Sequence, residues 1–207
     1  MKMQAYLITL YSWRITNQMN ENEWSETIKL FISSLELSKA IKIDTLTKLP
    51  YAYEILEYNQ DFSPKKENSM PFETDILIYE QERNTIKPRI IIEAKLASIT
   101  THDAITYSYK AQNHKSITPF IRYGIIIGNR KHYPLPGRLF RHGTNFDFMM
   151  SFQKEELSPI EKTTFDKLLR KELQYSHQLE EIFLNNRSID RNHYFVMQKE
   201  LKLIIME

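Results

Sequence analysis

Cysteine is absent from the 207 residues, and glycine is scarce, with only four. A chain without cysteine has no disulfide framework, no cysteine zinc site and no thiol nucleophile, and we expect a reducing cytoplasm as its setting. None of the glycines belongs to a GxxxxGK or GxGxxG pattern, which excludes nucleotide-binding loops of those two kinds. The six histidines form no HExxH pair, and no serine lies in a GxSxG turn. The corresponding zinc and serine hydrolases are therefore excluded as well.

Long apolar runs are also missing, because no stretch approaches the roughly 18–20 residues that cross a bilayer. Residues 1–14 lack the small-residue cleavage site and the long apolar segment of a signal peptide, and a first strand is possible there. We therefore expect no membrane partner. The length, with 42% hydrophobic and 26% charged residues, suits one domain with its own core.

Acidic residues are absent from Ala104 to Phe146, although the net charge of the whole chain is only +2. This basic block contains seven cationic side chains: Lys110, Lys115, Arg122, Arg130, Lys131, Arg138 and Arg141. Such a block is typical of a surface that binds a polyanion, and we expect these residues to contact DNA phosphates. The alternative is that the counter-charges come from elsewhere in the fold.

The order of helical and extended patterns predicts an α/β protein with a mixed sheet flanked by helices. Asn22 is the expected N-cap of the first helix, and a capping pattern at Ser158, with Pro159 following, opens the last helix. The segment 60–71 contains two prolines among polar residues, which indicates a loop. The expected elements are a helix at 22–40, strands at 49–58, 72–80 and 89–96, a helix at 101–115, a strand at 122–129, a loop at 130–145, a strand at 146–152 and a helix at 158–184.

Two carboxylates and a lysine stand out on the expected central strands. Glu93 and Lys95 are two residues apart on an apolar strand and therefore project from the same face. Charges in the middle of a sheet are costly unless they are paired or bound to a metal. If the strand with Asp75 pairs with this one as a hairpin, Asp75 and Glu93 converge on one point.

This combination suits the hydrolysis of a phosphodiester bond. Two carboxylates are hard oxygen ligands for Mg²⁺, which keeps further places for water and for substrate phosphate oxygens. The ion neutralises phosphate charge and lowers the pKa of a bound water, and a nearby lysine stabilises charge that develops in the transition state. The residues thus indicate a magnesium site at Asp75 and Glu93 with Lys95 beside it. The ordinary alternative is a cross-strand ion pair of Glu93 with Lys95, and Asp75 as a turn residue.

Asp75 followed by Glu93-Ala94-Lys95 on an apolar strand resembles the D…ExK signature of the PD-(D/E)xK nuclease superfamily, which includes the restriction-endonuclease-like fold. The order of elements over roughly residues 22–130 is similar too. The proline that names the motif is displaced here to Pro71, four residues before Asp75. The resemblance implies metal binding by Asp75 and Glu93, catalysis by Lys95, and Mg²⁺ as cofactor with Mn²⁺ able to substitute.

The resemblance implies further candidates and an assembly. Some relatives add an acid from the first helix, for which Glu26 and Glu23 are candidates, and others add a side chain from the helix after ExK, where Gln112 and Tyr107 lie. A homodimer is expected because double-strand cutting needs two active sites. We predict a single nuclease domain over 1–207, with a catalytic core at about 22–152 and a C-terminal helical extension at about 157–207.

The predicted activity is that of a Mg²⁺-dependent DNA endonuclease of restriction or other defence type. Two alternatives remain open from the sequence. One is a repair or recombination nuclease of the same fold, which a preference for branched or single-stranded DNA would indicate. The other is a non-catalytic nucleic-acid-binding module, which would bind DNA without any need for a metal.

Overall fold

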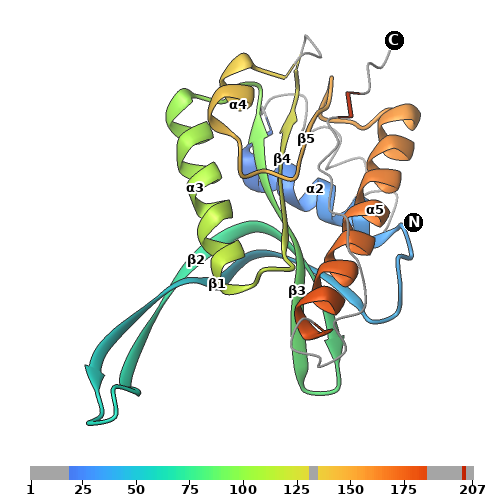
Figure 1. Cartoon of the computed structure of the whole chain (residues 1–207). Coiled ribbons are helices and arrows are strands. Elements are labelled where there is room, and N and C mark those ends of the chain that lie inside the picture. Colours follow the sequence, from blue (N-terminus) through green and yellow to red (C-terminus); the bar gives the residue numbers. More distant parts are fainter. Residues whose placement is uncertain (1–18, 131–134, 186–201, 204–207) are drawn as a thin grey trace, which may run out of the picture.

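A mixed five-stranded sheet forms the centre of the computed structural model, which describes residues 19–130, 135–185, 202 and 203. The strands lie side by side in chain order, with β1, β2 and β3 antiparallel and β3, β4 and β5 parallel (Figure 1). The prediction of an α/β fold with a mixed sheet flanked by helices is confirmed. The strands are β1 (Ile41–Tyr58), β2 (Pro64–Glu82), β3 (Thr85–Leu96), β4 (Arg122–Gly128) and β5 (Phe148–Ser151).

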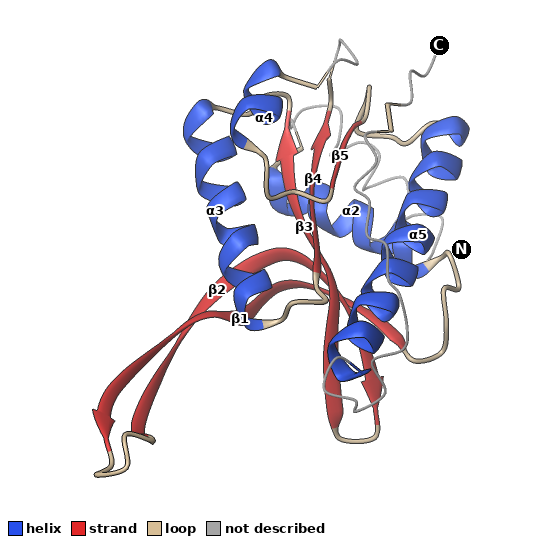
Figure 2. Ribbon diagram, in the orientation of Figure 1, coloured by secondary structure: helices blue, strands red, loops and turns tan. Residues whose placement is uncertain are grey.

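Helices cover both faces of this sheet, as Figure 2 shows. On one face, α2 (Glu21–Ser33) and α5 (Pro159–Asn185) pack against a core that includes Trp24, Ile28, Ile76, Ile92, Phe165 and Leu169. On the other face, α3 (Thr101–Ile117) and α4 (Gly137–His142) pack against a core that includes Leu77, Ile91, Ala104, Tyr123, Ile125 and Leu139. Helix α5 therefore completes the main core rather than extending from it.

The central strands β3 and β4 are apolar on both sides because helices cover both sides. Ile90 and Ile92 point into the core under α2 and α5, whereas Ile91 points into the core under α3. This is the continuous apolar pattern of strands in the middle of a covered sheet. Helix α3 begins after a capping box, in which Thr100 accepts the amide N–H of Asp103 and Asp103 accepts that of Thr100. The cap fixes the crossover from β3 to β4.

The segment 60–71 was expected to be a loop, and this prediction is wrong. Strand β2 already begins at Pro64 and continues through this segment, so β1 and β2 form a long two-stranded arm that projects from the body (Figure 1). Pro71 lies opposite Pro50, and neither has an N–H to donate. Proline is tolerated here because no other described strand pairs with β1 or β2 along the arm.

The boundaries of three other segments also differ from the prediction. Helix α2 starts one residue earlier than expected and ends at Ser33, well before Ala40, and β1 begins at Ile41 instead of residue 49. The expected loop at 130–145 contains the short helix α4, because Pro136 precedes a helical turn that buries Leu139. Residues 1–14 and the tail after Asn185, apart from 202 and 203, lie outside the described residues. Within the described part of the chain, we find no helix with the length and apolar character of a membrane span.

Candidate active site

Asp75 and Glu93 meet where β2 and β3 begin to pair. The first backbone pair between the two strands joins Ile76 to Ile92, so Asp75 stands just beyond it, beside Glu93. One oxygen of the Asp75 carboxylate, Oδ2, accepts the backbone N–H of Ala94 at 2.7 Å, which fixes the side chain against β3. The carboxyl groups of Asp75 and Glu93 are close enough for the charge of Asp75 to act on Glu93. The structure thus brings together the two acids that the sequence singled out.

Burial dominates the acid–base chemistry of this pair. Glu93 is only 1% exposed, and its burial, together with the negative charge of Asp75, raises the pKa of Glu93 to about 8. Burial also raises the pKa of Asp75, although the Ala94 N–H and the charge of Lys95 oppose that shift. The hydroxyl of Tyr123 donates a hydrogen bond to Glu93, and burial raises the pKa of Tyr123 as well. Without a cation, one proton is therefore shared within the pair at neutral pH.

Lys95 lies on the same face of β3, at the edge of the buried site. Its ammonium donates to the carboxylate of Glu21 at 2.8 Å and lies 5.0 Å from the ring centre of Tyr107. Burial lowers the pKa of Lys95, but the hydrogen bonds to Glu21 and Tyr107 outweigh burial, and the pKa ends above its usual range. Lys95 is therefore a cation at neutral pH, which makes it a hydrogen-bond donor and not a base.

The acid that α2 supplies to this site is Glu21. The two acids named from the sequence have other partners: Glu23 caps the helix with Asn20, and Glu26 accepts a hydrogen bond from Thr45. Asn20 and Glu23 form a capping box, so the helix begins two residues nearer the N-terminus than a cap at Asn22 would place it. The Asn-x-x-Glu spacing of this box was the signal that could have identified Glu21 as the first helical residue.

Helix α3 supplies Tyr107 and Lys110 to the same region. The ammonium of Lys110 lies 3.3 Å from the ring centre of Phe72 and 4.3 Å from that of Tyr107, and the residue is 7% exposed. Lys110 was expected on the DNA-binding surface, but its side chain turns into the site. Gln112, the other candidate on this helix, is exposed to solvent.

The rest of the basic block divides into two groups. The charges of Lys115 and Arg122 are matched within the chain, because both pair with Asp147 and Arg122 also binds Glu172 at 2.6 Å. For these two residues the counter-charges do come from outside the block. A second group lies beyond β3, where Arg130 donates to the carbonyl of Ala97 and Arg138 to that of Ile99. Arg141 is exposed on α4, and Lys131 lies outside the described residues.

The donor set suits a hard divalent cation. Among the described residues, no three side chains of histidine, aspartate or glutamate gather at one point, so the protein offers the pair of carboxylates alone. Magnesium is commonly held by one or two carboxylates, with water and substrate phosphate in its other places. Burial raises the pKa of both acids, and the charge of Asp75 adds to the shift at Glu93, so a bound cation would favour the charged forms of both. Asp75 and Glu93 thus fit a magnesium ion by their chemistry.

Comparison with known proteins adds a weak structural likeness. No protein-family model and no curated protein sequence matches the chain. Among solved structures, the chain is similar to the pre-specific restriction endonuclease BsaWI in its complex with DNA, with a TM-score of 0.41 and 15% sequence identity over 90% of this chain and 70% of that chain. A TM-score this low transfers neither an activity nor site residues to this protein.

Proposed function

We propose that this protein is a divalent-metal-dependent nuclease that hydrolyses phosphodiester bonds in DNA. The observation that carries the proposal is the pairing of the half-buried Asp75 with the buried Glu93 on adjacent strands, with the charged Lys95 on the same face. An inert sheet has no use for a buried glutamate beside a second carboxylate whose charge raises the pKa of the glutamate. A phosphodiesterase requires this concentration of hard oxygen ligands beside a cation.

In this proposal Asp75 and Glu93 hold Mg²⁺, or Mn²⁺ in its place. The bound ion supplies charge neutralisation at the phosphate and a water of lowered pKa. Asp75 is held in position by the N–H of Ala94, and Glu93 by the hydroxyl of Tyr123. Lys95, fixed by Glu21, donates a hydrogen bond to a phosphate oxygen on which negative charge accumulates.

The cationic side chains beyond β3 provide a path for the DNA backbone. Arg130 and Arg138 donate hydrogen bonds to the carbonyl groups two and four residues after Lys95. A carbonyl partner is neutral, so the bond to Ile99 leaves the positive charge of Arg138 in place. Arg141 is exposed on α4. Contacts of this kind position a nucleic acid without reading its sequence. A restriction or other defence role, membership of the PD-(D/E)xK superfamily and a homodimer belong to the same proposal.

Cleavage assays test this function directly. Purified protein is incubated with linear duplex, supercoiled and single-stranded DNA, in Mg²⁺ or in EDTA, beside Lys95→Ala. We expect cleavage only with Mg²⁺ and a rate about 10²–10³-fold lower in the variant, the usual loss when one transition-state donor is removed. Lys42→Ala is the matched control, because Lys42 is exposed on the outer strand β1.

The outcomes of this assay separate the proposal from its alternatives. DNA binding in EDTA without cleavage of any substrate in Mg²⁺ would contradict the proposal and favour a binding module. Cleavage confined to branched or single-stranded DNA would retain the nuclease and replace the restriction role by repair or recombination. Light scattering on the same samples measures the mass, for which a homodimer predicts twice the 24.8 kDa of the chain.

A further inference from the structure

Lys110 is an unusual residue for the inner face of a helix. Helix α3 otherwise buries mainly small side chains together with His114, yet at this position it buries a lysine of which only 7% is exposed. Lysine is rarely buried unless its charge is paired. The rings of Phe72 and Tyr107 lie within 3.3 and 4.3 Å of its ammonium and supply part of the compensation through their π faces.

The charge of Lys110 has no direct partner in the described part of the chain, where no ion pair or hydrogen bond to its ammonium is found. The carboxylates of Asp75 and Glu93 do interact with it electrostatically, but from beyond the 4.0 Å of an ion pair. Burial lowers the pKa of Lys110, and the attraction of Glu93 and Asp75 opposes that shift. The ammonium of Lys110 on α3 thus interacts with the charges of Asp75 and Glu93 on the sheet without forming an ion pair with either.

We propose that Lys110 is a second lysine of the active centre, whose ammonium binds a non-bridging oxygen of the same phosphodiester that Asp75, Glu93 and Lys95 act on. This inference rests on the proposed nuclease function. A phosphate oxygen provides the hydrogen-bond acceptor that the described chain does not, and a lysine ammonium has three donors to offer. The two aromatic rings fix the side chain, so the donor is in place before the substrate arrives.

The burial of Lys110 distinguishes this role from an ordinary backbone contact. An ammonium that follows the outer phosphates of a duplex must reach solvent, whereas the Lys110 side chain is enclosed between β2 and α3. In this proposal, the phosphate meets Lys110 beside Asp75 and Glu93, the two acids with which its ammonium interacts electrostatically. Lys110 should therefore affect turnover and the binding of a single phosphate group, and should contribute little to the affinity for long DNA.

The first experiment measures phosphate binding without any cleavage. Thymidine 5′-monophosphate is titrated by calorimetry into protein with Ca²⁺, for the wild type, Lys110→Met and the control Lys162→Met, which removes an exposed lysine from α5 on the opposite face of the sheet. Methionine suits the gap between the two rings, because it is apolar and of similar length. We expect Lys110→Met to bind the monophosphate about tenfold more weakly than the wild type, which is the cost of losing one charged hydrogen bond. Lys162→Met should bind it as the wild type does.

The second experiment compares single-turnover cleavage with the affinity for a long duplex. Lys110→Met should cleave about a hundredfold more slowly in Mg²⁺ and should bind the duplex in Ca²⁺ within about twofold of the wild type, because outer phosphates supply most of that affinity. A weaker duplex affinity with an unchanged rate would overturn the proposal and make Lys110 an outer backbone contact. Unchanged monophosphate binding and an unchanged rate would also overturn it.

Two further measurements keep the proposal testable if Lys110→Met does not fold. Lys110→Arg retains the cation and should keep monophosphate binding within a few fold of the wild type. In the wild-type protein, the dimethylated Lys110 side chain labelled with ¹³C should show an NMR shift on addition of the monophosphate, and an unmoved signal would overturn the proposal. If the wild type cleaves no DNA but binds the monophosphate through Lys110, the nuclease proposal fails and the phosphate site remains.

Discussion

At the scale of single residues, the hydrogen bond from Lys95 to Glu21 defines what this lysine can do. The ammonium is held at 2.8 Å from the carboxylate and near the ring of Tyr107, and its pKa lies above the usual range. A lysine in this state donates hydrogen bonds and positive charge throughout the neutral pH range. In the proposed nuclease, Glu21 is thus a positioning residue, which acts on the reaction through Lys95.

Glu21→Gln tests this positioning. The amide keeps a hydrogen-bond acceptor but loses the charge, so the Lys95 ammonium should be held less firmly. We expect the single-turnover rate to fall roughly ten- to a hundredfold, the cost of a slightly misplaced catalytic group, with the affinity for DNA unchanged. Glu26→Gln, which changes a carboxylate bonded to Thr45, is the comparison. A larger loss in Glu26→Gln than in Glu21→Gln would contradict this account of the site.

Glu93 makes the stability of the metal-free protein depend on pH. Its pKa is raised from 4.5 to about 8 in the folded state, mainly by burial and then by the charge of Asp75. Between these two values the folded state binds more protons than the unfolded state, so the free energy of unfolding falls as the pH rises. The stability that the protonated carboxyl contributes is present below about pH 4.5 and is lost as the pH passes through about 8.

Glu93→Gln should remove this dependence. In EDTA, we expect the free energy of unfolding of the wild type to fall with pH more steeply than that of the variant, by roughly 1 kcal/mol per pH unit between pH 5.5 and 7.5. Urea unfolding at several pH values measures the two slopes. Asp75→Asn should give a slope between these two. It removes the charge of Asp75 but leaves the burial of Glu93, which is the larger cause of the raised pKa of Glu93. Equal slopes for the wild type and Glu93→Gln would contradict the raised pKa.

At the scale of secondary-structure elements, the sequence predicted the strands of the candidate site well and the arm poorly. The three isoleucines before Glu93 and the helix after Lys95 identified β3 and α3, because both elements are buried and periodic. The arm could not be predicted in this way. Its residues are exposed on both faces and include Pro64 and Pro71, so neither apolar alternation nor strand propensity marks it.

The sequence likewise predicted only part of the candidate site, namely the residues on the two strands. Asp75, Glu93 and Lys95 were found because their spacing on two strands is a local property of the chain. Glu21 and the inward direction of Lys110 depend on how α2 and α3 pack on the sheet, and spacing along a single helix does not encode such packing. The cap at Asn20 instead of Asn22 shifted the expected first turn and directed attention to Glu23 and Glu26.

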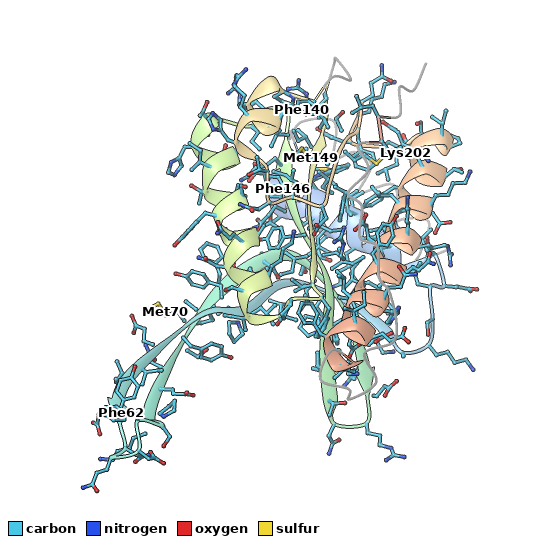
Figure 3. The ribbon with its side chains drawn as sticks, in the orientation of Figure 1. Phe62, Met70, Phe140, Phe146, Met149 and Lys202 are labelled. Carbon is cyan, nitrogen blue, oxygen red and sulfur yellow. The ribbon has the colours of Figure 1, made fainter. Side chains whose placement is uncertain are left out.

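The arm is expected to be dispensable for folding. Side chains from Tyr53 to Ser69 are exposed, and Phe62 at the end of the arm is 85% exposed, while Met70 lies nearer the body (Figure 3). Replacing residues 53–69 by Asn-Gly joins the paired residues Ala52 and Met70 through a two-residue turn. We expect the free energy of unfolding to change by less than about 1 kcal/mol in urea, as for surface changes. A loss above roughly 3 kcal/mol would show that the arm packs on the body.

At the scale of the whole molecule, the cationic side chains of the basic block are of two kinds. Some pair with acids inside the fold, and others are exposed to solvent. Arg122 binds the buried acids Glu172 and Asp147 and joins β4 to α5, whereas Arg141 is exposed on α4. His114 lies in the same block but is buried, its Nδ1 donates to the carbonyl of Pro50, and burial lowers its pKa to about 4. Summing charges along the sequence therefore overstates the positive charge that this region offers to DNA.

Two substitutions separate these roles. Arg122→Gln leaves Glu172 and Asp147 without their guanidinium, and we expect the free energy of unfolding to fall by about 3 kcal/mol, the typical cost of breaking a buried pair. Arg141→Gln should leave the stability within about 0.5 kcal/mol and weaken DNA binding measurably at low salt. Urea unfolding and fluorescence anisotropy with a labelled duplex measure both effects. The reverse pattern would contradict the assignment.

The most direct test of the central claim is the rate at which this protein cleaves supercoiled plasmid DNA in Mg²⁺, measured for the wild type beside Asp75→Asn. The asparagine retains the size of the side chain and removes the charge that a divalent cation needs. We predict nicked or linear product from the wild type, and a rate roughly a thousandfold lower in the variant, in line with the several kcal/mol that a catalytic metal supplies. Equal cleavage by both proteins, or cleavage by the wild type in EDTA, would contradict the claim that Asp75 and Glu93 hold the metal of a nuclease.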